Sequence, residues 1–99
     1  MKIPIEQLNK VFDSRLRIGI MSALMVNDFL NFNDLKALIE VPDGNLATHL
    51  RTLEDNKYIK VEKGFIGRKT NTTYTITKAG EKAFRSHLDA IEQIIRNLD

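Results

Sequence analysis

The sequence has 99 residues, which is the size of one domain and leaves no room for a catalytic domain beside a binding domain. It is 42% hydrophobic, enough to form a core, and it has no cysteine, which excludes disulfides, thiolate nucleophiles and cysteine-based metal sites. No apolar run approaches the roughly 20 residues that cross a bilayer, and no apolar stretch of signal-peptide length follows Met1. We therefore expect a soluble, cytoplasmic protein with no membrane partner, metal or cofactor.

Positive charge is concentrated in one part of the chain, although the formal net charge is only +2. Residues 57–82 carry seven lysines and arginines against two glutamates. A polyanion is the natural partner for such a patch, and a solvated lysine-rich surface is the alternative.

The first predicted element is a short helix over residues 5–12 that packs by one face. Its apolar residues have helical spacing: Ile5, Leu8, Val11 and Phe12. A second helix begins after Ser14, whose hydroxyl suits an N-cap, and ends near Asn27. Its apolar residues form a broad face: Leu16, Ile20, Met21, Leu24 and Met25. Residues 30–32 then suit a brief strand.

Two helices joined by a tight turn are predicted next, over about residues 34–56. Asn33 is a suitable N-cap for the first, residues 34–40, which would bury Leu35, Leu38 and Ile39. Residues 41–44 contain Pro and Gly and form the turn. The second helix, residues 43–56, would bury three leucines: Leu46, Leu50 and Leu53. This arrangement matches a helix-turn-helix.

The hydrophobic period changes from 3.6 to 2 after Lys57, which predicts a β-hairpin over about residues 58–77. Ile59 and Val61 share one face of the first strand, residues 58–63, and Tyr74 and Ile76 share one face of the second, residues 73–77. Glycine and polar residues dominate between them, so residues 64–72 are expected to form a long, basic, exposed loop.

A long helix, residues 78–98, is predicted to follow Thr77 as its N-cap. Its apolar residues lie at heptad spacing, which favours dimerisation through this helix, although covering the domain's own core is the alternative. The residues expected at the dimer interface are Ile5, Leu8, Phe84, Leu88, Ile91, Ile94, Ile95 and Leu98.

Several short motifs, taken in order, resemble those of winged helix-turn-helix regulators. They are D-G-N-L-x-x-H-L-x-x-L-E at residues 43–54, the Tyr58-Ile59 pair, Gly67-Arg68-Lys69, and Y-x-I-T at residues 74–77 before a helix with an early Gly80. Over about residues 5–98 the chain is similar to small MarR- and ArsR-like regulators of bacteria and archaea. The resemblance implies one mostly helical α+β domain, residues 1–99, with a β-hairpin wing and a long C-terminal dimerisation helix.

The sequence also departs from these regulators. Asn56-Lys57 stands where many relatives have a glycine, and asparagine tolerates the left-handed conformation of a helix C-cap. The chain lacks the cysteine and histidine cluster of metal-sensing ArsR-like proteins, so metal sensing is not carried over.

The helix predicted over residues 43–56 has a polar sector opposite its buried leucines. This sector suits the major groove of DNA, because short polar side chains reach base edges without holding the helix away from the duplex. Asn45 suits a bidentate contact to adenine and Arg51 a guanine or a phosphate, whereas His49, at the edge of the sector, suits either packing or DNA contact. Arg68 and Lys69 suit phosphate or the minor groove. The candidate DNA-binding residues are Asn45, Thr48, His49, Arg51, Thr52, Lys63, Arg68, Lys69, Thr70, Arg15 and Lys36.

The expected function is sequence-specific binding of double-stranded DNA by a homodimeric transcriptional regulator at a pseudo-palindromic operator. The alternative is a winged-helix module for protein assembly that does not bind DNA. An enzyme is disfavoured, because the two histidines are 38 positions apart and no phosphate-cradling glycine motif is present. His87 is expected to be a surface or interface histidine, and the sequence does not identify an effector.

Overall fold

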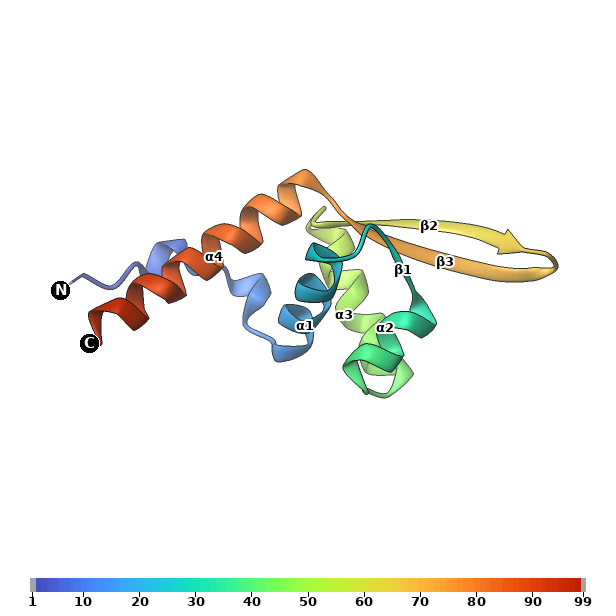
Figure 1. The fold of residues 1–99 in the computed structure, drawn as a ribbon, viewed down its shortest axis with the longest axis horizontal. Helices are drawn as coiled ribbons and strands as arrows, with labels where there is room; N and C mark the ends of the chain where they lie inside the picture. Colours follow the sequence, from blue (N-terminus) through green and yellow to red (C-terminus); the bar gives the residue numbers. More distant parts are fainter. Residues whose placement is uncertain (1, 99) are drawn as a thin grey trace.

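Helices and a three-stranded sheet make up residues 2–98, the part of the chain that the computed structural model describes apart from the side chain of Asp43 (Figure 1). Two turns of 3-10 helix, Ile5–Gln7 and Lys10–Phe12, come first. The remaining elements are α1 (Arg15–Met25), β1 (Leu30–Asn31), α2 (Phe32–Ile39), α3 (Asp43–Asp55), β2 (Ile59–Ile66), β3 (Lys69–Ile76) and α4 (Lys78–Asn97). The predicted α+β architecture, with a hairpin and a C-terminal helix, is confirmed.

The N-terminal segment is not the single helix predicted over residues 5–12. Leu8 and Asn9 are extended and separate the two 3-10 turns. The backbone N–H of Asn9 donates to Nδ1 of His87 over 2.9 Å, and its side chain accepts from the N–H of Val11. The prediction was wrong because these bonds to α4 and to the next turn replace the helical hydrogen bonds.

The core lies between α1, α2, α3 and the sheet. α1 begins after Ser14, whose hydroxyl accepts from the N–H of Arg17, and it buries its apolar face almost completely. The core residues that the structure buries are Phe12, Ile20, Met21, Leu24, Leu30, Leu35, Leu46, Leu50, Leu53, Ile59, Tyr74 and Phe84. The predicted inward leucines of α3 are thus confirmed.

α2 begins one residue after Asn31 and not at the predicted cap, Asn33. Asn31 accepts from the N–H of Asp34, whose carboxylate accepts from the N–H of Asn31 in turn, forming a reciprocal capping box. Leu38 is 60% exposed although its spacing predicted burial, because the short α2 packs only its Leu35 side against the core.

The two strands of the hairpin are longer than predicted, and the expected loop over residues 64–72 is wrong. β2 and β3 pair without interruption to the Ile66–Lys69 pair, which leaves a turn of two residues, Gly67 and Arg68. Gly67 has φ +62°, a conformation that suits glycine at the first position of a tight hairpin turn. The backbone hydrogen bonds between β2 and β3 do not depend on whether the side chains are polar, so the polar composition of residues 64–72 wrongly indicated a loop.

β3 also pairs with β1, which gives the sheet the strand order β1-β3-β2. Leu30 of β1 lies opposite Tyr74, so the short strand closes the second edge of β3 near its C-terminal half.

The junction between β3 and α4 is tightly packed. Thr77 caps α4 as predicted, because its hydroxyl oxygen accepts from the N–H of Gly80 over 2.9 Å. The same hydroxyl donates to the carbonyl of Lys57, and the Thr77 N–H donates to the carbonyl of Tyr58. A Cβ at position 80 would lie 2.0 Å from the Tyr58 carbonyl oxygen, so only glycine permits this approach.

α4 packs its first turns on the core and the N-terminal segment, and its last turns extend beyond the other helices (Figure 1). His87 is 4% exposed, and its ring lies 5.2 Å from that of Phe12. The prediction of a surface or interface histidine was wrong, because the N-terminal segment covers this face of α4. No helix within residues 2–98 has the length and hydropathy needed for a membrane span.

Candidate nucleic-acid interface

α3 has a buried face and an opposite exposed polar face. Leu46, Leu50 and Leu53 are buried, which fixes the rotation of the helix about its axis. Asn45, Thr48 and Arg51 are exposed on the other side, and Thr52 is partly covered at its edge. The predicted sector is therefore open to a partner over most of its length.

The two threonines of this face bond to their own helix. The Thr48 hydroxyl donates to the Gly44 carbonyl over 3.0 Å, and the Thr52 hydroxyl donates to the Thr48 carbonyl over 3.2 Å. Each oxygen keeps acceptor capacity, and each methyl group is available for apolar contact with a thymine methyl. The face can accept hydrogen bonds through Thr48 and Thr52 and both donate and accept through Asn45.

Arg15 and Asn45 lie at the same groove, beside the start of α3. This groove has a volume of about 500 Å³, and its lining also includes Ile39, Glu40 and Pro42. The structure thus brings the predicted backbone-contact residue Arg15 to the N-terminal end of the predicted base-reading helix. Lys36, the other predicted cation, is exposed on α2.

His49 is partly buried and held by α1. A guanidinium nitrogen of Arg17 lies 2.8 Å from Nδ1 of His49, and the Arg17 Nε donates to the carbonyl of Val11. Burial lowers the pKa of His49 below its ordinary value, and the positive charge of Arg17 lowers it further. Sequence reasoning missed Arg17, because its spacing on α1 gives no sign that it meets a residue 32 positions later.

The hairpin register divides the predicted basic residues between two faces. Directly paired residues share a face, and faces alternate along a strand. Lys63 and Thr70 therefore lie on the face of the buried Ile59 and Tyr74, which is the face toward the helices. Lys69 lies on the opposite face, although both lysines are exposed.

The hairpin tip is exposed and carries apolar as well as basic side chains. Arg68 occupies the turn, and Phe65 and Ile66 before it are 74% and 67% exposed. Both residues lie within the loop predicted over residues 64–72, and no role was predicted for them.

α3 lies close to the base of the projecting hairpin. In Figure 1 the hairpin extends away from α4, and α2 and α3 lie below the base of the hairpin. Thr70 borders a groove at the start of α2, together with Asn31, Phe32 and Asn33. The exposed Thr48 surface is not covered by the rest of the described chain, so both predicted contact regions are open to a partner.

Comparison with known proteins identifies the fold. The model of the winged helix DNA-binding domain family matches residues 16–95. The chain belongs to this family. The β2–β3 hairpin is therefore its wing, and the predicted resemblance to winged-helix regulators is confirmed.

Three proteins illustrate the similarity. The chain is 32% identical over 90 residues to the uncharacterized protein MJ0432 of Methanocaldococcus jannaschii, covering 91% of this chain and 98% of the other. A transcriptional regulator homologue of Pyrococcus horikoshii OT3 superposes with a TM-score of 0.79 at 28% identity, covering 95% and 98% of the two chains. A Porphyromonas gingivalis W83 protein named for the MarR family of transcriptional regulators gives a TM-score of 0.72 at 20% identity, covering 96% and 88%.

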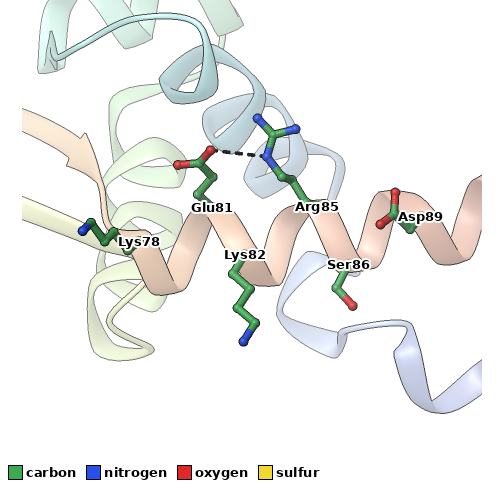
Figure 2. Close-up of a pocket in the computed structure, with 6 residues that line it drawn as sticks. All are labelled: Lys78, Glu81, Lys82, Arg85, Ser86 and Asp89. Atoms are coloured by element: carbon green, nitrogen blue, oxygen red, sulfur yellow. Dashed lines mark hydrogen bonds and ion pairs between the residues drawn. The ribbon is translucent and has the colours of Figure 1, made fainter.

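A further hollow lies along α4. The hollow drawn in Figure 2, about 410 Å³, is lined by residues of α4 alone, with Glu81 and Arg85 paired across 3.3 Å. Its other lining residues are Lys78, Lys82, Ser86 and Asp89. Within residues 2–98 no group of three or more acidic or histidine side chains is arranged to hold a metal ion.

The residues predicted at a dimer interface fall into three groups. Phe84 is buried against Phe12 in the protein's own core, which leaves it no surface for a partner chain. Leu8, Ile91 and Ile94 are partly buried. The exposed group comprises Ile5, Leu88, Ile95 and Leu98.

Proposed function

We propose that this chain is a homodimeric transcriptional regulator that binds double-stranded DNA in a sequence-specific manner. The observation that carries the proposal is an exposed polar face on α3, a helix that lies at the base of a basic, projecting wing. A B-DNA major groove admits one helix, and this face has short side chains that permit close approach. The description of the family as a DNA-binding domain supports the same conclusion.

Each contact region would have a distinct role. Asn45, Thr48, His49, Arg51 and Thr52 would face base edges or nearby phosphates in the major groove. The wing residues Lys63, Arg68, Lys69 and Thr70 would lie along the adjacent backbone or minor groove, and Arg15 and Lys36 would contact phosphates beside α3. Because the register places Lys63 and Lys69 on opposite wing faces, we assign the closer contact to Lys63 and to Arg68 at the tip.

Dimerisation is supported by the exposed apolar end of α4. Ile95 is 56% exposed and Leu98 is 75% exposed, and the exposed Ile5 lies on the N-terminal segment that packs along α4. A second copy would remove this apolar surface from water. A two-fold dimer would then bind a pseudo-palindromic operator with half-sites roughly 34–36 Å apart.

The test is selection of bound fragments from a random pool of duplex DNA, followed by measurement of the mass of the free protein. A palindromic consensus bound by a dimer is expected. The proposal of sequence-specific regulation would fail if the selection gave no consensus sequence and the protein bound duplex DNA no more tightly than it bound an unrelated acidic polymer.

One observation favours the second candidate, a module for protein assembly. Exposed Phe65 and Ile66 provide the large apolar side chains that protein interfaces use as anchors. If assembly were the function, the chain would bind no duplex in a gel shift. We propose no catalytic role, since the family is a DNA-binding one and both histidines bond to the protein itself.

A further inference from the structure

The contact between Arg17 and His49 determines which nitrogen of the imidazole carries the proton. The guanidinium of Arg17 has only donors, and one of its nitrogens lies 2.8 Å from Nδ1 of His49. Nδ1 must therefore accept. A neutral imidazole that accepts at Nδ1 carries its proton on Nε2.

Arg17 is held in place from a second side. Its Nε donates to the carbonyl of Val11, just before α1, while its Nη1 reaches His49 on α3. Two bonds in different directions fix the planar guanidinium, because its donors have a rigid arrangement. The orientation of the His49 ring is therefore set by α1 and by the segment before it.

The Nε2 edge of His49 is open to solvent. His49 is partly buried, and Nδ1 is the ring nitrogen that has a partner within the described residues. In that part of the chain no side-chain nitrogen or oxygen is buried without a partner, so Nε2 reaches the surface. It does so one helical turn after Asn45 and next to Thr48, on the edge of the exposed face of α3.

We propose that Arg17 is a positioning residue that fixes His49 as a hydrogen-bond donor at Nε2 for the bound duplex. This inference rests on the proposed function, since it concerns the same face of α3. The acceptors that match such a donor are the N7 of a purine, the O6 of guanine, the O4 of thymine and a phosphate oxygen. Cytosine presents a donor in the major groove, so this position disfavours it.

The donor is neutral at physiological pH. Arg17 on α1 is the charged group that faces His49, and together with burial it lowers the pKa of the imidazole. Protonation of Nδ1 would place two donors against each other. The contact with DNA therefore stays constant as pH varies around neutrality.

The first test requires no DNA. Nitrogen NMR shifts of the histidine side chains report which ring nitrogen is protonated, and the chain has only two histidines. His87 serves as an internal reference, because its Nδ1 accepts from the N–H of Asn9 and its proton must also be on Nε2. We expect the Nε2–H form for His49 in the unmodified protein, and a dominant Nδ1–H form would overturn the proposal.

The second test uses Arg17→Met, which keeps an apolar stem and removes the donors, and Arg17→Lys, which restores one donor. On the selected operator we expect Arg17→Met to weaken binding about threefold to tenfold at pH 8, the usual range for one hydrogen bond. Binding by Arg17→Met should recover as pH falls, because a protonated His49 donates from both nitrogens. The unmodified protein should show little pH dependence, and Arg17→Lys should resemble it.

Modified DNA identifies the acceptor. If His49 contacts the N7 of a purine, 7-deazapurine substitution weakens binding of the unmodified protein and not of His49→Ala, and if it contacts an exocyclic base oxygen, a base analogue that lacks that oxygen has this effect. If it contacts a phosphate, a single methylphosphonate has that effect. Equal affinities of Arg17→Met and the unmodified protein at every pH would overturn the proposal, whereas failure of the unmodified protein to select any DNA would overturn the proposed function and leave the NMR result standing.

Discussion

The two ends of this molecule differ in the chemistry of their exposed surfaces. At the end formed by α3 and the wing, the exposed side chains are mostly short and polar or basic, such as Asn45, Thr48 and Arg68, and large apolar side chains are confined to the wing tip. At the end formed by the N-terminal segment and the last turns of α4, large apolar side chains such as Ile95 and Leu98 are exposed. The first surface suits a polyanion, and the second suits removal from water by another apolar surface.

The difference arises from how each helix is supported. α3 lies against the core along its whole buried face, so its polar face is presented rigidly. The last turns of α4 extend past the core, and the N-terminal segment lies along α4 (Figure 1). The chain thus has a supported polar surface on α3 that suits recognition. At the end of α4 it has an exposed apolar surface that a second copy can cover.

The largest expected effect comes from breaking the junction between the two ends. Gly80→Ala would place a Cβ 2.0 Å from the Tyr58 carbonyl oxygen. Neither atom can move away by side-chain rotation, because both are attached directly to the backbone. We expect a loss of about 3 kcal/mol or more in the free energy of unfolding, measured by urea denaturation.

A matched substitution gives the opposite sign. Nothing lies within 4 Å of a Cβ built at Gly44, on the exposed face of α3. Gly44→Ala should stabilise the protein by about 0.5–1 kcal/mol through helix propensity. If the two alanine variants had equal free energies of unfolding, the close approach of Gly80 to Tyr58 would not contribute to stability.

The next effect concerns the apolar end. The double substitution Ile95→Lys with Leu98→Lys should convert the proposed dimer to a monomer. A dimer of this variant would have to bury four ammonium groups, and the free-energy cost of doing so exceeds the gain from burying the apolar surface. Light scattering after size-exclusion chromatography measures the change in mass.

Val26 provides the control for this experiment. It is an 81% exposed apolar residue just after α1, away from the last turns of α4. Val26→Lys should leave the mass unchanged, and dissociation by this variant as well would place the interface elsewhere.

DNA contacts should give smaller, separable effects. Asn45→Ala should cost about 1–3 kcal/mol on the selected operator and almost nothing on random DNA, because a base contact reads sequence. Arg68→Ala should weaken binding to both and reduce the slope of log affinity against log salt by about one. Fluorescence anisotropy at several salt concentrations measures both.

Lys60 is the matched cation in the same wing. Its ammonium group lies 3.0 Å from the Glu62 carboxylate, and it faces away from Lys63. Lys60→Ala should change DNA affinity less than Arg68→Ala does, and the reverse order would indicate that the other face of the wing meets the duplex.

The smallest effect is a pH dependence of stability through His49. Its pKa is lowered in the folded protein, so as pH falls through about 6.5 the unfolded chain takes up a proton before the folded one does. Folding is therefore destabilised from about pH 6.5 down to the folded pKa. His49→Gln should remove this part of the decline, seen as the difference between two urea-denaturation series, and identical series would exclude it.

Local sequence patterns predicted much of the fold and of the candidate site. Leucine spacing on α3 fixed both its buried and its exposed face, and the alternating residues around Ile59 and Tyr74 identified the paired strands. The hairpin loop was misjudged because Gly64 was treated as a break, whereas the ladder continues through it opposite Asn71. The cap of α2 was misplaced by two residues, since Asn31 and Asn33 are both suitable and only reciprocal bonding with Asp34 decides between them.

The sequence by itself determined which residues form helices and strands, which faces are apolar and where positive charge gathers, because these follow from short-range periodicity and composition. The tertiary structure alone decided that His87 accepts from Asn9, that Arg17 meets His49, and that Gly80 passes Tyr58. Each of these contacts joins segments more than twenty residues apart. Their geometry depends on how whole helices pack, which no local pattern in the chain encodes.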